Sequence, residues 1–151
     1  MEIIRDQKIV QDSWRHIEDG DPVPESGDVT VSLIRFGAER SDLDARSGRD
    51  GVRVGPDEEI DTIIADLGKL PLIAVTFPKF TDGRGYSTAR LLRGRHGYTG
   101  ELRATGQIFR DQLFYLHRVG FDAFEMAPGK SLSDALEGFS DFSVTYQSSS
   151  R

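Results

Sequence analysis

A short and almost continuously apolar run, Leu72-Ile73-Ala74-Val75-Thr76-Phe77, constrains the fold of this chain more than any other segment. A strand with one face in water alternates apolar and polar residues, whereas a continuous apolar run is typical of a strand covered on both faces. The run follows a stretch at 56–67 that has isoleucines and a leucine at helical spacing and ends at Gly68. A covered strand next to a helix predicts an α/β fold.

Strand and helix patterns continue to alternate toward the C-terminus. Two glycine–aromatic pairs, Gly97-Tyr98 and Gly120-Phe121, lie 23 residues apart, and a second glycine follows the first one of each pair after nine residues. In each unit the first glycine is expected to end a helix in the left-handed conformation, and the second to open the loop after a strand. The other expected strands are 52–54, 102–105, 123–126 and 143–146, and the other expected helices are 87–96, 110–119 and 131–139. Repeated βα units predict a mainly parallel sheet, either open or half-barrel-like.

The N-terminal part has a different pattern. Two extended pieces around a polar turn at 2–10 predict a small β-hairpin. Proline and glycine interrupt any regular pattern at 18–28, which predicts a loop, and 29–34 is the next expected strand. The predicted organisation is therefore an N-terminal hairpin and loop appendage, residues 1–28, followed by a single α/β domain, residues 29–151.

Composition excludes several kinds of chemistry. The chain has no cysteine, so it forms no disulfide, uses no thiolate and holds no cysteine-ligated iron–sulfur cluster. Its three histidines, His16, His96 and His117, lack a zinc-binding spacing, so no metal site is predicted. Because it has neither a long apolar segment nor a signal-peptide pattern, we expect a cytoplasmic protein that binds no membrane. Nucleic acid is not among the expected partners.

Charge is distributed unevenly along the chain. Residues 1–70 carry 9 basic and 17 acidic side chains, whereas residues 71–151 carry 10 basic and 8 acidic ones. The segment 79–118 has 8 basic and 3 acidic side chains. This segment suits an anionic ligand or an acidic partner.

Three loops that follow the expected strands carry the candidate binding residues. In parallel βα folds such loops meet at the carboxyl edge of the sheet, where ligands bind. Glycines let a backbone approach closely, and cations neutralise a phosphate, a sulfate-like group or a carboxylate. The predicted ligand-binding residues are Lys79, Asp82, Gly83, Arg84, Gly85 and Ser87 in the first loop, Gly106 and Arg110 in the second, and Lys130 in the third. Arg90 and Arg93, which share a helix face, are predicted to bind a partner.

Simpler interpretations exist for the same residues. Asp82-Gly83 can be a turn, Ser87 a helix N-cap and Arg84 a solvent-facing side chain. The first loop lacks the third glycine of a dinucleotide motif, and Pro128-Gly129-Lys130-Ser131 lacks the upstream glycine of a P-loop. A nucleotide triphosphate site is therefore disfavoured. No arrangement of serine, histidine and aspartate is apparent, so no catalytic residue is assigned.

Several segments together resemble a bacterial family of small proteins whose genes commonly neighbour those of assimilatory sulfite reduction. The segments are Phe77-Pro78-Lys79-Phe80-Thr81-Asp82-Gly83-Arg84-Gly85-Tyr86-Ser87, Ala89-Arg90-Leu91-Leu92-Arg93, Gly100-Glu101-Leu102-Arg103-Ala104, Asp111-Gln112-Leu113 and Gly120-Phe121-Asp122-Ala123-Phe124-Glu125. Weaker similarity covers Gln11-Asp12-Ser13-Trp14 and Gly51-Val52-Arg53-Val54. Members of this family are often labelled probable oxidoreductases of sulfite reduction.

The resemblance implies a place in sulfite reduction and leaves the chemical task open. A chain without cysteine cannot hold the iron–sulfur centre of a sulfite reductase. We therefore expect an accessory protein that binds an anionic ligand, such as sulfite or sirohaem, or the sulfite reductase itself, through a basic loop edge. The alternative is a small oxidoreductase, or another enzyme of an anionic substrate, that uses a non-covalently bound cofactor such as a flavin.

Overall fold

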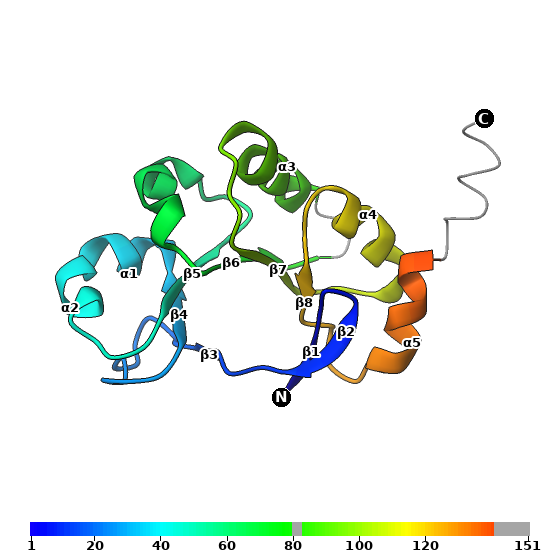
Figure 1. Cartoon of the computed structure of the whole chain (residues 1–151), viewed down its shortest axis with the longest axis horizontal. Coiled ribbons are helices and arrows are strands. Elements are labelled where there is room, and N and C mark those ends of the chain that lie inside the picture. Colours follow the sequence, from blue (N-terminus) through cyan, green and yellow to red (C-terminus); the bar gives the residue numbers. More distant parts are fainter. Residues whose placement is uncertain (80–82, 141–151) are drawn as a thin grey trace.

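The computed structural model describes residues 1–79 and 83–140, and the strands in these ranges form one eight-stranded sheet (Figure 1). The strands are β1 (Glu2–Arg5), β2 (Lys8–Gln11), β3 (Arg15–His16), β4 (Val29–Ser32), β5 (Asp50–Val54), β6 (Leu72–Phe77), β7 (Glu101–Gly106) and β8 (Ala123–Phe124). The α-helices are α1 (Leu33–Ala38), α2 (Arg40–Asp44), α3 (Arg84–Arg90), α4 (Leu113–Arg118) and α5 (Leu132–Leu136). The 3₁₀ helices are η1 (Ile60–Lys69), η3 (Arg110–Gln112) and η4 (Glu137–Ser140), and η2 (Leu91–Arg95) is a π-helical turn.

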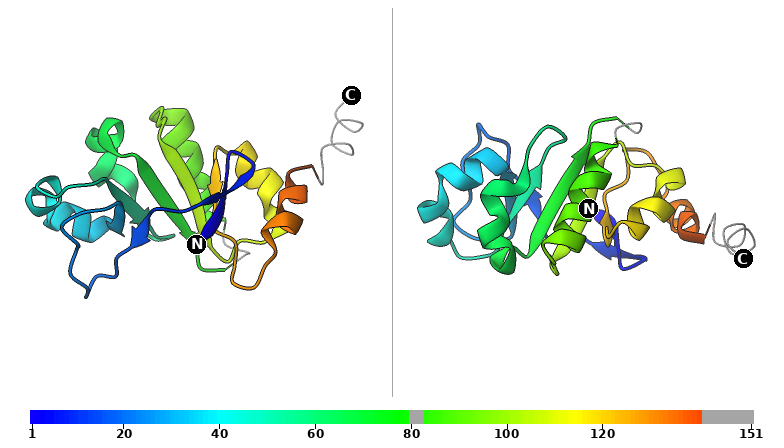
Figure 2. Two further views of the ribbon diagram at one scale, coloured as in Figure 1. Left: turned by 60° about the horizontal axis from the view of Figure 1, so that its bottom comes forward. Right: turned by 90° about the horizontal axis from the view of Figure 1, so that it is seen from above.

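The sheet has the strand order β2-β1-β8-β7-β6-β5-β4-β3. From β3 to β8 each strand pairs in parallel with the next one along the chain, whereas β1 pairs antiparallel with β8 and β2. Because the strand order never reverses between β3 and β8, right-handed crossovers place the connecting helices on the same face of the sheet. The sheet curls into a half-barrel with helices on its outer side (Figures 1 and 2). Of the two predicted sheet forms, the half-barrel is confirmed.

The core lies between the sheet and these helices. The outer face of the strands contributes fully buried aliphatic side chains, including Val52, Ile73, Val75 and Leu102. The β6 strand, 72–77, has the predicted bounds. None of the helices in the described ranges has the length and apolarity needed to cross a bilayer.

The glycine–aromatic units are confirmed by the backbone. Gly97 and Gly120 have φ of 64° and 117°, and each ends a helical segment in the left-handed region. Gly106, the last residue of β7, and Gly129, in the loop five residues after the end of β8, have φ of 100° and 81°. L side chains rarely adopt this conformation, so glycine is the residue that these positions require.

Several predicted strands differ in length from those observed. The strands predicted at 52–54 and 102–105 are longer, at Asp50–Val54 and Glu101–Gly106, whereas two others are shorter. The strand predicted at 29–34 ends at Ser32, because the Ser32 Oγ accepts a hydrogen bond from the Arg35 backbone N–H at 3.2 Å and begins α1. The strand predicted at 123–126 is restricted to Ala123–Phe124. The strand predicted at 143–146 lies outside the described residues.

The N-terminal hairpin is confirmed, and it extends the main sheet. β1 and β2 form the predicted antiparallel pair, and Ile4 pairs with Phe124 of β8. Ile3 and Ile4 are fully buried. After β2 the chain crosses the concave side of the half-barrel to reach β3 at the opposite edge (Figure 1). We call residues 12–17 the crossing segment.

Candidate functional site

The loop after β6 contains most of the predicted ligand-binding residues. Lys79, Gly83, Arg84 and Ser87 are exposed, and Asp82 lies outside the described residues. Arg84 Nη1 donates to the Asp57 carboxylate, so this cation already has an acidic neighbour. Of the six ligand-binding residues predicted in this loop, the structure thus describes all but Asp82.

Two of the glycines that were predicted to bind a ligand, Gly85 and Gly106, have packing roles. A Cβ on Gly85 would lie 2.4 Å from Cζ of Phe77, so the absence of a side chain lets α3 lie directly on β6. A Cβ on Gly106 would lie 2.4 Å from the Phe77 carbonyl oxygen. Gly83 differs, because no atom would lie within 4 Å of a Cβ there. Close helix and strand packing therefore explains Gly85 and Gly106 without a ligand.

Ser87, another predicted ligand-binding residue, lies beside acidic side chains. It lines a groove between η1 and α3 together with Glu58, Glu59 and Asp61. Carboxylates repel an anion, so this side of α3 does not favour anion binding. We call this surface the acidic groove.

Arg110 and Lys130 lie together at the carboxyl edge of the sheet. They come from the loops after β7 and β8 and line one pocket of about 470 Å³ with Phe109, Asp111, Gln112 and Asp134. We call it the edge pocket. Lys130 Nζ lies 5.1 Å from the centroid of the Phe109 ring, a cation–π contact. The structure thus brings together two of the predicted cations from loops that are distant in sequence.

The edge pocket also contains acidic groups. Arg110 Nη1 donates to Asp134 Oδ1 at 2.8 Å, and the side chains are 34% and 61% exposed. An ion pair this exposed contributes little to stability, about 0–1 kcal/mol. An incoming anion can therefore compete with Asp134 for Arg110.

The two predicted partner-binding arginines have different environments. Arg93 Nε donates to the Gly120 carbonyl at 2.8 Å, and its Nη1 donates to the carbonyls of Tyr98 and Gly100, each at 2.8 Å. Its guanidinium thus fastens the end of the α3–η2 helix to two loops. Arg90 is exposed on α3, on the side away from the acidic groove, and lines a separate groove between α3 and α4. Arg90 and Arg93 are thus only three positions apart, but Arg93 holds loops together whereas Arg90 lies on the surface.

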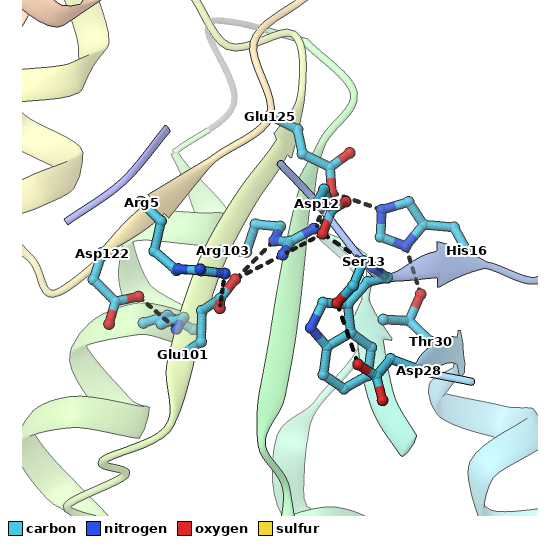
Figure 3. Close-up of polar contacts among 12 residues, drawn as sticks. Arg5, Asp12, Ser13, His16, Asp28, Thr30, Glu101, Arg103, Asp122 and Glu125 are labelled. Atoms are coloured by element: carbon cyan, nitrogen blue, oxygen red, sulfur yellow. Dashed lines mark hydrogen bonds and ion pairs between the residues drawn. The ribbon is translucent and has the colours of Figure 1, made fainter. Parts of the chain in front are cut away.

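A charged network occupies the concave face around Arg103 of β7 (Figure 3). The fully buried guanidinium donates from Nε to Glu101 Oε2 at 2.9 Å, and from Nη1 to Asp12 Oδ2 at 3.0 Å and Glu125 Oε2 at 2.8 Å. Nη2 lies 3.1 Å from Asp12 Oδ1 and 2.8 Å from Glu101 Oε2. The guanidinium thus makes four hydrogen bonds and a further ion-pair contact with three carboxylates, which already neutralise its charge.

His16 continues this network along the crossing segment. Its Nε2 donates to Glu125 Oε2 at 2.6 Å, and its Nδ1 lies 2.5 Å from Thr30 Oγ1. Arg53 Nη1 donates to the Thr30 carbonyl at 2.8 Å, and Nη2 donates to the Ile17 carbonyl at 2.8 Å. The crossing segment is therefore fastened to β4, β5 and β7 and to the end of β8.

The pKa values of Glu125 and Arg103 favour the charged forms of these two side chains. Burial acts to raise the pKa of Glu125, but the hydrogen bond and charge of His16, followed by those of Arg103, hold that pKa below its ordinary value. Burial acts to lower the pKa of Arg103, yet hydrogen bonds to Asp12 and Glu125 raise it above its ordinary value. Arg103 and Glu125 are thus each held in the charged form by the other and by their neighbours.

The sequence reasoning missed the members of this network. A usable signal was present in β7, where Glu101 and Arg103 alternate with apolar Leu102 and Ala104. Charged residues at every second position of a strand point to a polar face. In the described part of the chain, no group of three or more histidine, cysteine, aspartate or glutamate side chains is placed to hold a metal ion.

Comparison with known proteins identifies the family but no activity. A family model with the description "Bacterial protein of unknown function" (DUF934) matches residues 51–151. The match covers β5 to the C-terminus, including Arg103, Glu125 and both cations of the edge pocket. No curated protein matches the chain. Because the model matches more than half of the chain, this protein belongs to the DUF934 family of bacterial proteins of unknown function.

Proposed function

We propose that this protein is an accessory protein of assimilatory sulfite reduction, which binds an anionic ligand or the sulfite reductase through its basic loop edge. The pathway rests on the sequence resemblance to proteins encoded beside sulfite reduction genes. The binding role rests on one observation: Arg110 and Lys130, from separate loops, line the same edge pocket. Two cations from adjacent βα loops suit an anion at the edge where such folds place their ligands.

The edge pocket suits a small oxyanion or an acidic group on a larger partner. Arg110 offers a planar guanidinium, and Lys130 a compact ammonium held over the Phe109 ring. Sulfite carries the charge that these groups neutralise, and so does a carboxylate of sirohaem or of an acidic protein surface. The exposed Arg110–Asp134 ion pair opens at little cost to admit the anion.

The direct test compares sulfite binding by the wild-type protein and by the double variant Arg110→Ala, Lys130→Ala, using isothermal titration at low salt. We expect the variant to bind at least about tenfold more weakly, since each charge-assisted hydrogen bond contributes about 1.5–3 kcal/mol. A matched control is Lys8→Ala, Arg15→Ala, which removes one exposed lysine and one exposed arginine from β2 and β3.

The same variants test the cellular role. A strain lacking this gene, complemented with each variant, is grown with sulfite as the sulfur source, and the reductase is co-purified at low salt. Equal growth, equal co-purification and equal sulfite binding for the edge variant and the wild type would refute the proposal. A bound flavin in the purified protein, identified by its absorption spectrum, would favour the cofactor-dependent enzyme instead.

A further inference from the structure

A pocket of about 450 Å³ lies at the amino edge of the sheet, where α1, α2 and the end of η1 meet the starts of β5 and β6. The buried side chains of Phe36 and Leu70 contribute apolar surface to it, and six of its lining residues are charged. It shares no residue with the edge pocket, which lies at the opposite, carboxyl edge of the sheet. We call it the amino-edge pocket.

One side of the amino-edge pocket is cationic. Arg40 donates from Nη1 and Nη2 to the two carboxylate oxygens of Asp66, at 2.8 and 2.9 Å, and its Nε has no hydrogen-bond acceptor in the described ranges. Lys69 follows Asp66 by three positions in η1, and residues three apart share a face of a 3₁₀ helix. Lys69 is exposed, and its side chain forms no hydrogen bond or ion pair with a residue of 1–79 or 83–140. Two cations and one carboxylate thus give this side a net charge of +1.

The other side of the amino-edge pocket is anionic. Asp50 forms an ion pair with Arg46, whereas the exposed side chain of Asp44 has no ion pair or hydrogen bond within the described part of the chain. Burial raises the pKa of Asp50, and the charge of Asp44 adds to this rise, although Arg46 acts to lower it. The two carboxylates are therefore close enough to repel each other. With Arg46 as their cation, they give this side a net charge of −1.

The two charged sides are one helical turn apart. Arg40 and Asp44 are the first and last residues of α2, and residues four apart are neighbours on a helix surface, with Cβ atoms about 5–6 Å apart. They form no ion pair with each other, because the guanidinium of Arg40 is bound to Asp66. A ligand with one charge would be attracted to one side of the pocket and repelled by the other. A ligand with both charges a few bonds apart fits both sides.

We propose that the amino-edge pocket binds a small zwitterion that carries the ammonium and carboxylate groups of an amino acid and an apolar side chain. The carboxylate contacts Lys69, the ammonium contacts Asp44, and the apolar side chain packs on Phe36 and Leu70. Each charged group of the ligand thereby gains a partner of opposite sign in a partly dehydrated site. This inference goes beyond the proposed function, since it uses none of the edge-pocket residues.

The test uses L-leucine and two analogues that each lack one charge. 3-Methylbutylamine has the ammonium without the carboxylate, and 4-methylpentanoate has the carboxylate without the ammonium. Binding at low salt is followed by amide chemical shifts of the ¹⁵N-labelled full-length protein, and the same spectra confirm that each variant is folded. The variants are Lys69→Met and Asp44→Asn. Their matched controls are Lys8→Met and Asp42→Asn, which change exposed residues that do not line the pocket.

We expect L-leucine to bind the wild type at least about fivefold more tightly than either analogue, since each analogue loses one charge-assisted contact. Lys69→Met and Asp44→Asn each weaken leucine binding at least about fivefold, whereas the two control variants change it less than about twofold. Lys69→Met does not weaken binding of 3-methylbutylamine, because that analogue has no carboxylate. The double variant Arg110→Ala, Lys130→Ala retains leucine binding, which separates this proposal from the proposed function.

Three outcomes would overturn the inference. The first is the absence of chemical-shift changes at the lining residues of the amino-edge pocket with about 10 mM L-leucine. The second is binding of one analogue as tightly as leucine, which would indicate a site for a single charge. The third is an equal loss of leucine binding for Lys69→Met and Lys8→Met, which would indicate attraction to the net charge of the protein.

Discussion

The concave face and the groove between α3 and α4 provide opposite environments for an arginine side chain. On the concave face, the buried guanidinium of Arg103 is surrounded by the carboxylates of Asp12, Glu101 and Glu125. In the groove, Arg90 is exposed and no carboxylate lines the surface beside it. A buried charge must be neutralised within the protein, whereas an exposed charge stays solvated until a partner arrives. The first arrangement therefore holds the fold together, whereas the second leaves the charge of Arg90 at the surface.

The charged network on the concave face holds a distant part of the chain against the sheet. Asp12 lies 91 residues from Arg103 in sequence, and their ion pair holds the crossing segment against the half-barrel. His16 adds a second attachment, through Glu125. Half-barrels leave the inner face of the sheet uncovered by helices, and here a short N-terminal segment covers part of it with ionic contacts (Figure 3). The charged side chains of the concave face thus contact one another and hold the crossing segment in place.

The largest expected effect comes from removing the buried cation. Arg103→Met leaves three neighbouring carboxylates without their shared partner, and we expect a loss of about 3–5 kcal/mol in the free energy of unfolding. Arg90→Met is the matched control, and its cost should be within about 0.5 kcal/mol because the side chain is exposed and packs little. Urea unfolding followed by circular dichroism measures both. Similar losses of unfolding free energy for Arg103→Met and Arg90→Met would contradict the view that only the buried arginine stabilises the fold.

The second-largest expected effect is a loss of stability on substitution of Gly85, which was predicted, like Gly83, to bind an anion. Gly85→Ala places a methyl group 2.4 Å from the Phe77 ring, and we expect a loss of about 3 kcal/mol, the upper end of the range for overpacking. Gly83→Ala is the control, since a Cβ there meets no atom within 4 Å and the backbone φ of −90° is allowed for alanine. If both glycines tolerate alanine equally, close helix packing is not the reason for Gly85.

Local patterns predicted much of the fold. The apolar run at 72–77 matches β6, and the glycine–aromatic pairs correctly predicted left-handed turns after two helical segments. These features depend on residues that are close in sequence, so a pattern can reveal them. The end of β4 at Ser32 was missed because a serine in an apolar run gave no visible sign of its capping role.

The candidate surfaces were predicted less completely, because their members come together only in the tertiary structure. Sequence reasoning named Arg110 and Lys130 from the expected meeting of loops, and they do share a pocket. It treated Arg90 and Arg93 as equivalent, since helical spacing cannot show that loop carbonyls surround Arg93. Arg118, which lines the groove between α3 and α4 together with Arg90, was counted among the basic residues of 79–118 but not placed beside Arg90. Such pairings depend on how neighbouring helices pack.

The smallest expected effect is the change in stability when the Glu125 carboxylate on the concave face loses its charge. The pKa of Glu125 is below its ordinary value in the folded protein, so the ionised carboxylate stabilises the fold. This contribution is complete above the unfolded-state pKa of about 4.3, and it is lost as the pH falls through the lower folded-state pKa. Acidification should therefore weaken the attachment of the crossing segment by protonating Glu125.

Glu125→Gln isolates this contribution. We expect the variant to be less stable than the wild type by about 1.5 kcal/mol at neutral pH, since the amide oxygen still accepts from Arg103 but the negative charge beside His16 is gone. As the pH falls below about 4, the wild type loses the same charge, so the two unfolding free energies should converge. Glu59→Gln, at an exposed position, should show no such pH-dependent gap. A gap between Glu125→Gln and the wild type that stays constant down to pH about 3 would mean that Glu125 acts through its shape and hydrogen bonds, and the concave face would then not depend on the ionised carboxylate at this position.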